Sequence, residues 1–153
     1  MTLFVTAGTT GFDRLAEEMD RLSTVLQEPV TIQIGPGRYL PRRASFFRFA
    51  ASLDPYYREA SLVVAHGGLA TCMEVLELGR PLIGVSNPDR YDDHQRDLLT
   101  VLEAEGYLLY CRHLADLGDA VQQARQMRFR RYERPEVSIH LWIREFLNGT
   151  DRE

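Results

Sequence analysis

Residues 61–78 constrain the fold of this chain more than any other stretch. The apolar run Ser61-Leu62-Val63-Val64-Ala65 predicts a buried strand, and apolar residues at helical spacing continue to position 78. Between strand and helix lie His66, Gly67 and Gly68. A helix start carries backbone N–H groups without intrahelical partners and the positive end of the peptide dipole, which suits a phosphate. The glycines let a diphosphate approach the backbone closely, because a Cβ atom would block it.

Two further residues of the predicted helix are candidates for the same ligand. Glu74 lies about one turn into the helix, where its carboxylate, which only accepts hydrogen bonds, can hold two ribose hydroxyl groups. Thr71 is either a further phosphate contact or an ordinary helix residue, and both interpretations stay open. The chain has no G-x-G-x-x-G spacing, so the sequence does not indicate a dinucleotide site.

Strand and helix patterns alternate along the chain. Further strands are predicted at residues 3–7, 30–34, 46–49, 81–85 and 107–110, and a last helix at about 135–148. This alternation predicts an α/β fold, with one doubly wound parallel sheet in a single domain spanning residues 1–153. Such sheets bind ligands beyond the carboxyl ends of their strands, so the loops beginning at Gly8, His66 and Ser86 are expected to line one crevice.

Local signals mark the ends of several helices. Thr10 with Asp13, and Asp116 with Asp119, have the spacing of capped helix starts. Gly79 stands where a C-terminal cap is expected. The loop that contains Gly8, Thr9 and Thr10 is either a second phosphate-binding turn or a simple connector. The arginines of the loop after residue 34 are solvated, or they contact an anionic lipid, an acidic sugar or a partner subunit.

Composition excludes several classes of protein. The net charge is −4, which argues against a general nucleic-acid binder. There is no lysine, so Schiff-base chemistry is excluded. Cys72 and Cys111 are the only cysteines and no secretory leader is visible, which predicts reduced thiols in the cytosol. Cys72 is expected to serve packing. Asp92-Asp93 lacks the spacing of a metal site, so neither a metal nor another cofactor is expected.

A longer series of motifs resembles a known family. It consists of His66-Gly67-Gly68 with Glu74, then Gly79-Arg80-Pro81-Leu82, then Asp93-His94-Gln95. The series is similar to the nucleotide-sugar-binding, C-terminal half of GT-B glycosyltransferases of the family 28 type. It resembles most the small catalytic subunits, which bind the donor, of split bacterial exopolysaccharide glycosyltransferases and of the split GlcNAc transferase of dolichol-linked oligosaccharide assembly. The resemblance covers nearly the whole chain and implies a single Rossmann-like sheet, one half of a GT-B fold.

The resemblance implies roles for individual residues. Glu74 would bind the ribose of a UDP-sugar, and the residues of both glycine-containing turns would hold its diphosphate. Phe49 lies where relatives recognise uracil through main-chain groups. Gln95, and less directly His94, would face the donor sugar, although many relatives have Asp-Gln where this chain has His-Gln. The implied binding set is Gly8, Thr9, Thr10, Phe49, His66, Gly67, Gly68, Thr71, Glu74 and Gln95.

The resemblance also implies a reaction and partners. Relatives of this kind transfer a sugar with inversion, which requires a base for the acceptor hydroxyl. His94 and Asp13 are the candidates on this chain, and a residue of a missing second half is an equal alternative. A membrane-anchored partner subunit would bind a lipid-linked saccharide acceptor and hold this cytoplasmic chain at the inner face of the membrane. Self-association of the isolated chain stays open. The alternative to a donor-binding catalytic subunit is a non-catalytic UDP-sugar-binding subunit that stabilises a partner transferase.

Overall fold

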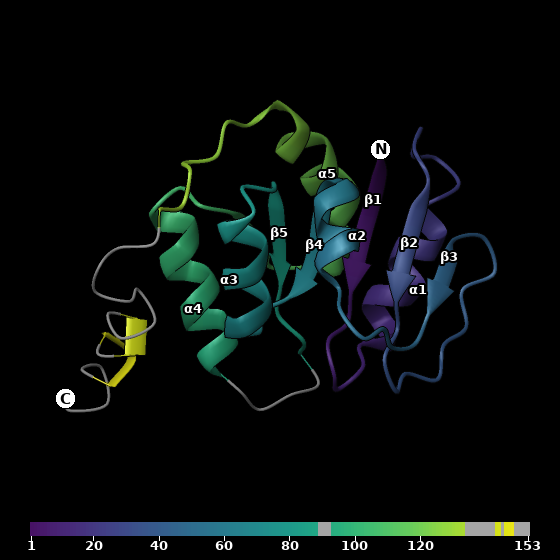
Figure 1. Ribbon diagram of the computed structural model, residues 1–153, viewed down its shortest axis with the longest axis horizontal. Coiled ribbons are helices and arrows are strands. Elements are labelled where there is room, and N and C mark those ends of the chain that lie inside the picture. Colours follow the sequence, from purple (N-terminus) through teal and green to yellow (C-terminus); the bar gives the residue numbers. More distant parts are fainter. Residues whose placement is uncertain (89–92, 134–142, 145, 149–153) are drawn as a thin grey trace.

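Six parallel strands form one sheet in the computed structural model, in the order β3-β2-β1-β4-β5-β6 (Figure 1). The structure describes residues 1–88, 93–133, 143–144 and 146–148. The strands are β1 (Thr2–Thr6), β2 (Val30–Gln33), β3 (Ser45–Phe47), β4 (Ala60–His66), β5 (Leu82–Val85) and β6 (Leu109–Cys111). All five strand pairs are parallel, so every strand delivers its carboxyl end to the same edge of the sheet.

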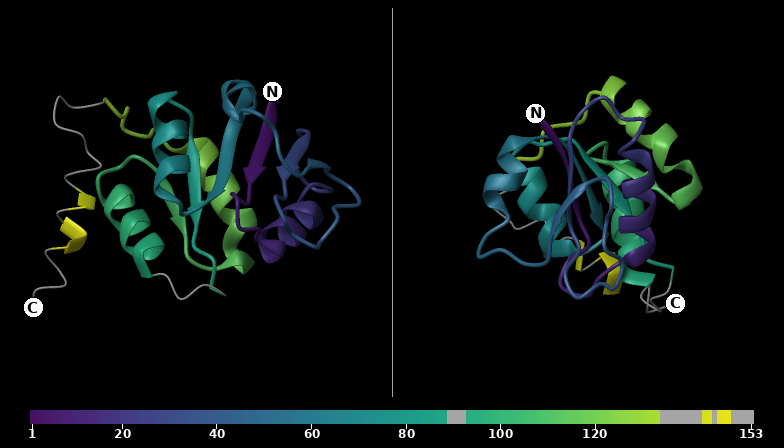
Figure 2. Two further views of the ribbon diagram at one scale, coloured as in Figure 1. Left: turned by 60° about the horizontal axis from the view of Figure 1, so that its bottom comes forward. Right: turned by 90° about the vertical axis from the view of Figure 1, so that its right-hand side faces the viewer.

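Helices cover both faces of this sheet, as Figure 2 shows. They are α1 (Asp13–Leu22), α2 (Asp54–Glu59), α3 (Leu69–Glu77), α4 (Asp93–Ala104) and α5 (Leu117–Gln126), with a 3₁₀ turn η1 at Leu114–Asp116. Helices α1 and α5 pack on one face, and α2, α3 and α4 pack on the other. The predicted α/β class with a doubly wound, Rossmann-like parallel sheet is therefore confirmed.

The two cores follow from the alternation of side chains along the strands. Leu3 and Val5 of β1 belong to the core beneath α1 and α5, whereas Phe4 points to the opposite face and joins the core beneath α2, α3 and α4. Central strands β1 and β4 are buried on both faces, which explains why their sequences are almost continuously apolar.

The predicted last strand is displaced. It was expected at residues 107–110, but β6 begins at Leu109. Gly106 has φ of +80° and ends α4. The N–H of Tyr107 donates to the carbonyl of Leu102 at 3.0 Å, in the manner of a Schellman turn. Tyr107 therefore completes the helix end, and pairing with β5 begins two residues later.

The third strand is shorter than predicted. The sequence pattern indicated residues 46–49, but β3 spans Ser45–Phe47. The carbonyl of Arg48 accepts a hydrogen bond from the N–H of Gly35 at 3.1 Å, beyond the last residue of β2. The chain then leaves the sheet, and Phe49 is 61% exposed on the loop towards α2.

Both predicted side-chain caps are wrong, whereas the predicted end of α3 is confirmed. Helix α1 has Phe12 at its N-cap and no side-chain cap, so Thr10 does not start it. Asp116 stands at the N-cap of α5, but its side chain makes no capping bond. Gly79 has φ of +69°, just beyond α3. Of the helix expected at about 135–148, residues 143–144 and 146–148 are helical, and the rest lies outside the described residues.

No helix within the described part of the chain is long and apolar enough to cross a membrane.

Candidate functional site

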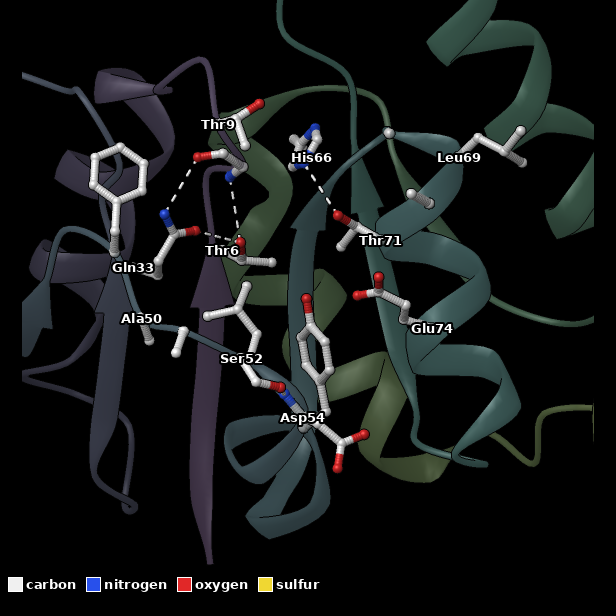
Figure 3. A pocket seen from close by; sticks show the side chains of 17 residues that line it. Thr6, Thr9, Gln33, Ala50, Ser52, Asp54, His66, Leu69, Thr71 and Glu74 are labelled. Atoms are coloured by element: carbon white, nitrogen blue, oxygen red, sulfur yellow. Dashed lines mark hydrogen bonds between the residues drawn. The ribbon is translucent and has the colours of Figure 1, made fainter.

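A cavity of about 740 Å³ opens at the carboxyl ends of β1, β2 and β4 (Figure 3). Three segments form most of its wall: the end of β1 with the loop after it, residues 49–54 leading into α2, and the turn from β4 into α3; Gln33 and Tyr57 complete it. They lie far apart in the sequence and meet because parallel strands of one sheet deliver them to the same edge. This is the edge at which doubly wound sheets bind ligands.

The β4–α3 turn leaves the start of α3 open to the cavity. Gly68 is the N-cap residue, with φ −70° and ψ 135°, and no side chain caps the helix. Gly68, Leu69, Ala70 and Thr71 all line the cavity. The first amides of a nine-residue helix are therefore presented to it together with the positive end of the helix dipole.

His66 lies between the two glycine turns. A Cβ atom on Gly8 would lie 2.3 Å from His66 Nε2, and one on Gly68 would lie 2.4 Å from His66 Cε1. Its ring Nε2 is also 3.4 Å from Thr71 Oγ1. Only glycine at positions 8 and 68 leaves room for the imidazole, so both glycines and the histidine form one structural unit. Gly8 additionally has φ of +73°, a backbone conformation that favours glycine.

A buried polar network forms the floor beneath the β1 turn. Thr6 Oγ1 donates to Gln33 Oε1 at 2.5 Å and accepts from the N–H of Gly8 at 3.2 Å. Gln33 Nε2 donates to the carbonyls of Arg48 at 2.8 Å and Gly8 at 3.3 Å. The network joins β1, β2 and the segment after β3, and it fixes the turn that carries Gly8.

Glu74 and Tyr57 face the same cavity from α3 and α2. Glu74 is the sixth residue of α3 and is exposed, while Cys72, Met73, Val75 and Leu76 around it are buried. Figure 3 shows the Glu74 side chain directed into the cavity. Burial is the main cause that raises the pKa of Tyr57, and the negative charge of Glu74 raises it further.

Seven of the ten predicted binding residues line the cavity. They are Gly8, Thr9, Phe49, His66, Gly68, Thr71 and Glu74.

Three predicted binding residues do not line the cavity. Thr10 lies further along the β1–α1 loop. Gly67 instead contacts α4, because a Cβ atom there would lie 2.9 Å from Leu99 Cδ1 and 3.1 Å from Cβ of Gln95. Position 67 therefore requires glycine so that α4 can pack against the β4–α3 turn. Gln95, at the start of α4, packs beside it.

The two candidate bases also lie outside the cavity wall. His94 is exposed on the first turn of α4. Asp13 uses Oδ1 to accept the backbone N–H groups of Arg38 at 2.9 Å and Tyr39 at 3.1 Å. Asp13 Oδ1 thus anchors the β2–β3 loop, a structural role that the sequence pattern did not indicate. Ser86, the start of the third expected loop, hydrogen-bonds to the Tyr110 hydroxyl at 2.8 Å and is absent from the wall.

The sequence interpretation missed several residues of the cavity. Thr6 and Gln33 are buried polar residues at the carboxyl ends of their strands, and a polar residue at that position was the available signal. Tyr57 carried no such signal, because an aromatic residue in a short helix also fits the core. The missed lining residues are Thr6, Gln33, Ala51, Ser52, Leu53, Asp54, Tyr57, Leu69 and Ala70.

The fold and the site together define a Rossmann-like domain with a phosphate-suited helix start at its ligand-binding edge. The family model for the glycosyltransferase family 28 C-terminal domain matches residues 2–145. The chain therefore belongs to that family.

Individual relatives agree with this assignment. The chain is 34% identical over 122 residues to the human UDP-N-acetylglucosamine transferase subunit ALG13, a match that covers 71% of this chain and 11% of that protein. It is 32% identical over 105 residues to the UDP-N-acetylglucosamine--N-acetylmuramyl-(pentapeptide) pyrophosphoryl-undecaprenol N-acetylglucosamine transferase of Caulobacter vibrioides, covering 64% of this chain and 28% of that enzyme. This chain thus spans only a small part of each relative.

The solution structure of ALG13 has the same fold. It superposes with a TM-score of 0.61 at 16% identity, and the match covers 95% of this chain and 94% of that one.

Proposed function

We propose that this chain is the donor-binding catalytic subunit of a two-component inverting glycosyltransferase, which moves a sugar from a UDP-sugar to a lipid-linked acceptor in exopolysaccharide or glycolipid assembly. One observation carries the proposal. The uncapped start of α3, the Gly8 turn and the Glu74 carboxylate all face one cavity. A nucleoside diphosphate presents the groups that match them, namely two phosphates and a ribose with two hydroxyls.

The diphosphate belongs at the β4–α3 turn in this proposal. The N–H groups of residues 69–71 are donors at a helix start that no side chain caps, and the Gly8 turn, whose own N–H is held by Thr6 Oγ1, lies opposite them across the cavity. His66 stands between the two turns and adds a ring N–H. When the glycosidic bond breaks, the leaving diphosphate gains negative charge, and donors fixed in advance stabilise it. The proposal assigns this stabilisation to the protein and requires no metal.

The other parts of the donor follow from this placement. The ribose hydroxyls donate to Glu74, whose carboxylate is acceptor-only at neutral pH. Uracil lies along residues 49–54, where Phe49 and Ala50 offer main-chain groups. The sugar extends past Gly67 towards Gln95 and His94 at the start of α4, which lie outside the cavity itself.

The acceptor and its base come from a second subunit in this proposal. One Rossmann-like sheet is half of a GT-B fold, and both candidate bases on this chain lie outside the cavity wall. The names of the two relatives support the arrangement: one is called a subunit, and the other names a pyrophosphoryl-undecaprenol substrate. A membrane-anchored partner would hold the chain at the cytoplasmic face, next to that acceptor.

Calorimetric titration with UDP tests the site. We expect Glu74→Ala to weaken binding about 100-fold, because two hydrogen bonds to a charged acceptor are lost at ~1.5 kcal/mol each. Glu77→Ala is the matched control, since Glu77 is exposed on the same helix and does not line the cavity. Equal affinities for wild type and Glu74→Ala would contradict the ribose assignment.

The accessory alternative needs a separate experiment. The chain is co-expressed with a membrane-anchored partner encoded beside it, and the complex is assayed with UDP-sugars and lipid-linked acceptor. The catalytic proposal expects product that disappears with Glu74→Ala. Product that forms equally well with wild-type and Glu74→Ala chain, but less well when the chain is left out, would assign it the accessory role.

A further inference from the structure

The hydroxyl of Tyr57 is a buried polar group that the fold itself does not use. The side chain is 1% exposed, lies near the end of α2 and lines the cavity. Within the part of the chain that the structure describes, its oxygen is covered from solvent and has no hydrogen-bond partner of ordinary geometry; the Thr71 side chain lies close enough to lower the pKa of Tyr57 against the larger effect of burial, but makes no such bond. Such groups are uncommon in folded proteins because the lost hydration is not replaced.

Packing accounts for the ring of Tyr57 but not for its hydroxyl. The ring meets Phe4 edge-on, with centroids 5.7 Å apart, and belongs to the core beneath α2, α3 and α4. Phenylalanine at this position would fill the same core without an unpaired oxygen. The hydroxyl therefore calls for a partner that enters the site.

The polar residues of α3 on the same wall are Thr71 and Glu74. Glu74 is exposed in this structure, with its side chain solvated. Burial and the charge of Glu74 raise the pKa of Tyr57, so the phenol stays protonated at neutral pH and can donate. A carboxylate accepts at about four positions, enough for two ribose hydroxyls and one phenol together.

We propose that Tyr57 is a positioning residue for Glu74. In the complex with a nucleoside diphosphate, the Glu74 carboxylate, which already points into the cavity, receives the ribose hydroxyls and accepts a hydrogen bond from Tyr57. The inference rests on the ribose site proposed above. Its physical benefit is that the phenol, fixed in the core, adds a hydrogen bond that favours the carboxylate orientation that binds ribose, which offsets part of the entropy lost when the side chain is ordered.

Tyr57→Phe removes the single atom in question. We expect the affinity for UDP to fall about tenfold, the usual loss for one hydrogen bond to a charged group. The thermal midpoint should stay equal or rise, since a buried unpaired oxygen is removed. Tyr56→Phe is the matched control, because Tyr56 stacks on Phe4 and Phe47 at 5.2 and 4.6 Å and does not line the cavity.

The role through Glu74 is tested by a double-mutant cycle with Glu74→Gln and by titration with 2′-deoxyuridine diphosphate. We expect Tyr57→Phe to have little further effect in the Glu74→Gln background and a smaller effect on the deoxy ligand. If Glu74→Gln weakens UDP binding but Tyr57→Phe does not, the inference about Tyr57 fails while the proposed ribose site stands. An equal loss in both backgrounds, or a lowered midpoint with unchanged affinity, also overturns it. If Glu74→Gln binds UDP as wild type does, the ribose site fails with it.

Discussion

Gly8→Ala tests whether the two glycine turns and His66 form one unit. The substitution has two separable costs. Gly8 has φ of +73°, and an L-residue in that conformation costs ~1–2 kcal/mol. The added Cβ atom would also lie 2.3 Å from His66 Nε2, so the imidazole must move. Forcing a packed side chain aside costs about 1–3 kcal/mol more.

Gly79→Ala separates these costs. Gly79 has φ of +69°, and nothing lies within 4 Å of a Cβ atom placed there. It therefore carries the backbone cost alone. We expect Gly79→Ala to lower the free energy of unfolding by ~1–2 kcal/mol and Gly8→Ala by about 2–5 kcal/mol. Urea titration followed by circular dichroism measures both, and a shift of about 2–4 °C per kcal/mol in the thermal midpoint provides a second reading.

A third variant identifies the group that Gly8→Ala displaces. In a His66→Ala background the new Cβ atom meets no imidazole, so Gly8→Ala should cost no more than Gly79→Ala does. UDP affinity should fall for Gly8→Ala and stay unchanged for Gly79→Ala. Equal destabilisation by Gly8→Ala and Gly79→Ala in the wild-type background would refute the packing argument.

Two further predictions concern buried polar groups. Gln33→Leu removes three side-chain hydrogen bonds, one of them from the buried Thr6 hydroxyl, whose donor is left without its acceptor, so we expect a loss of ~2–4 kcal/mol in urea titration; a loss below ~1 kcal/mol would show that the network is dispensable. Burial alone would raise the pKa of Asp20, but hydrogen bonds from the N–H groups of residues 42–44 and the hydroxyl of Tyr39 lower it from 3.8 to about 2. The folded-state pKa is thus depressed, so this stabilisation is complete above about pH 4 and is lost as the pH falls towards 2. The loss should be ~2 kcal/mol, and Asp20→Asn should flatten that part of the pH profile; an unchanged profile in the variant would disprove the assignment.

The sequence predicts most of the fold because its signals are local and repeated. Alternation of apolar strands with helical spacing fixes a parallel sheet, and His66 with the residues around it marks the ligand edge. The wrong predictions concern features that depend on contacts between residues far apart in the sequence. Thr10 and Asp13 have the spacing of a cap, yet the Asp13 carboxylate instead binds backbone N–H groups that lie 25 and 26 residues away.

Residues of the candidate site could be predicted where the residue type has few other structural explanations at its position in the sequence. Gly8, Gly68 and Glu74 stand out for that reason, and the structure places all three at the cavity. Gly67 shows the opposite case. It adjoins His66 in sequence but packs against α4, and only the position of that helix in space reveals the difference.

The β2–β3 loop illustrates how two acidic residues of α1 prepare a surface. Asp13 and Asp20 accept hydrogen bonds from five backbone N–H groups of residues 38–44, and Tyr39 adds its hydroxyl. The guanidinium groups of Arg38, Arg42 and Arg43 are left exposed on this tethered segment. A ligand that binds these arginines meets a loop whose conformation is already fixed in the folded protein. The affinity of that ligand is therefore not reduced by the entropy cost of ordering the loop.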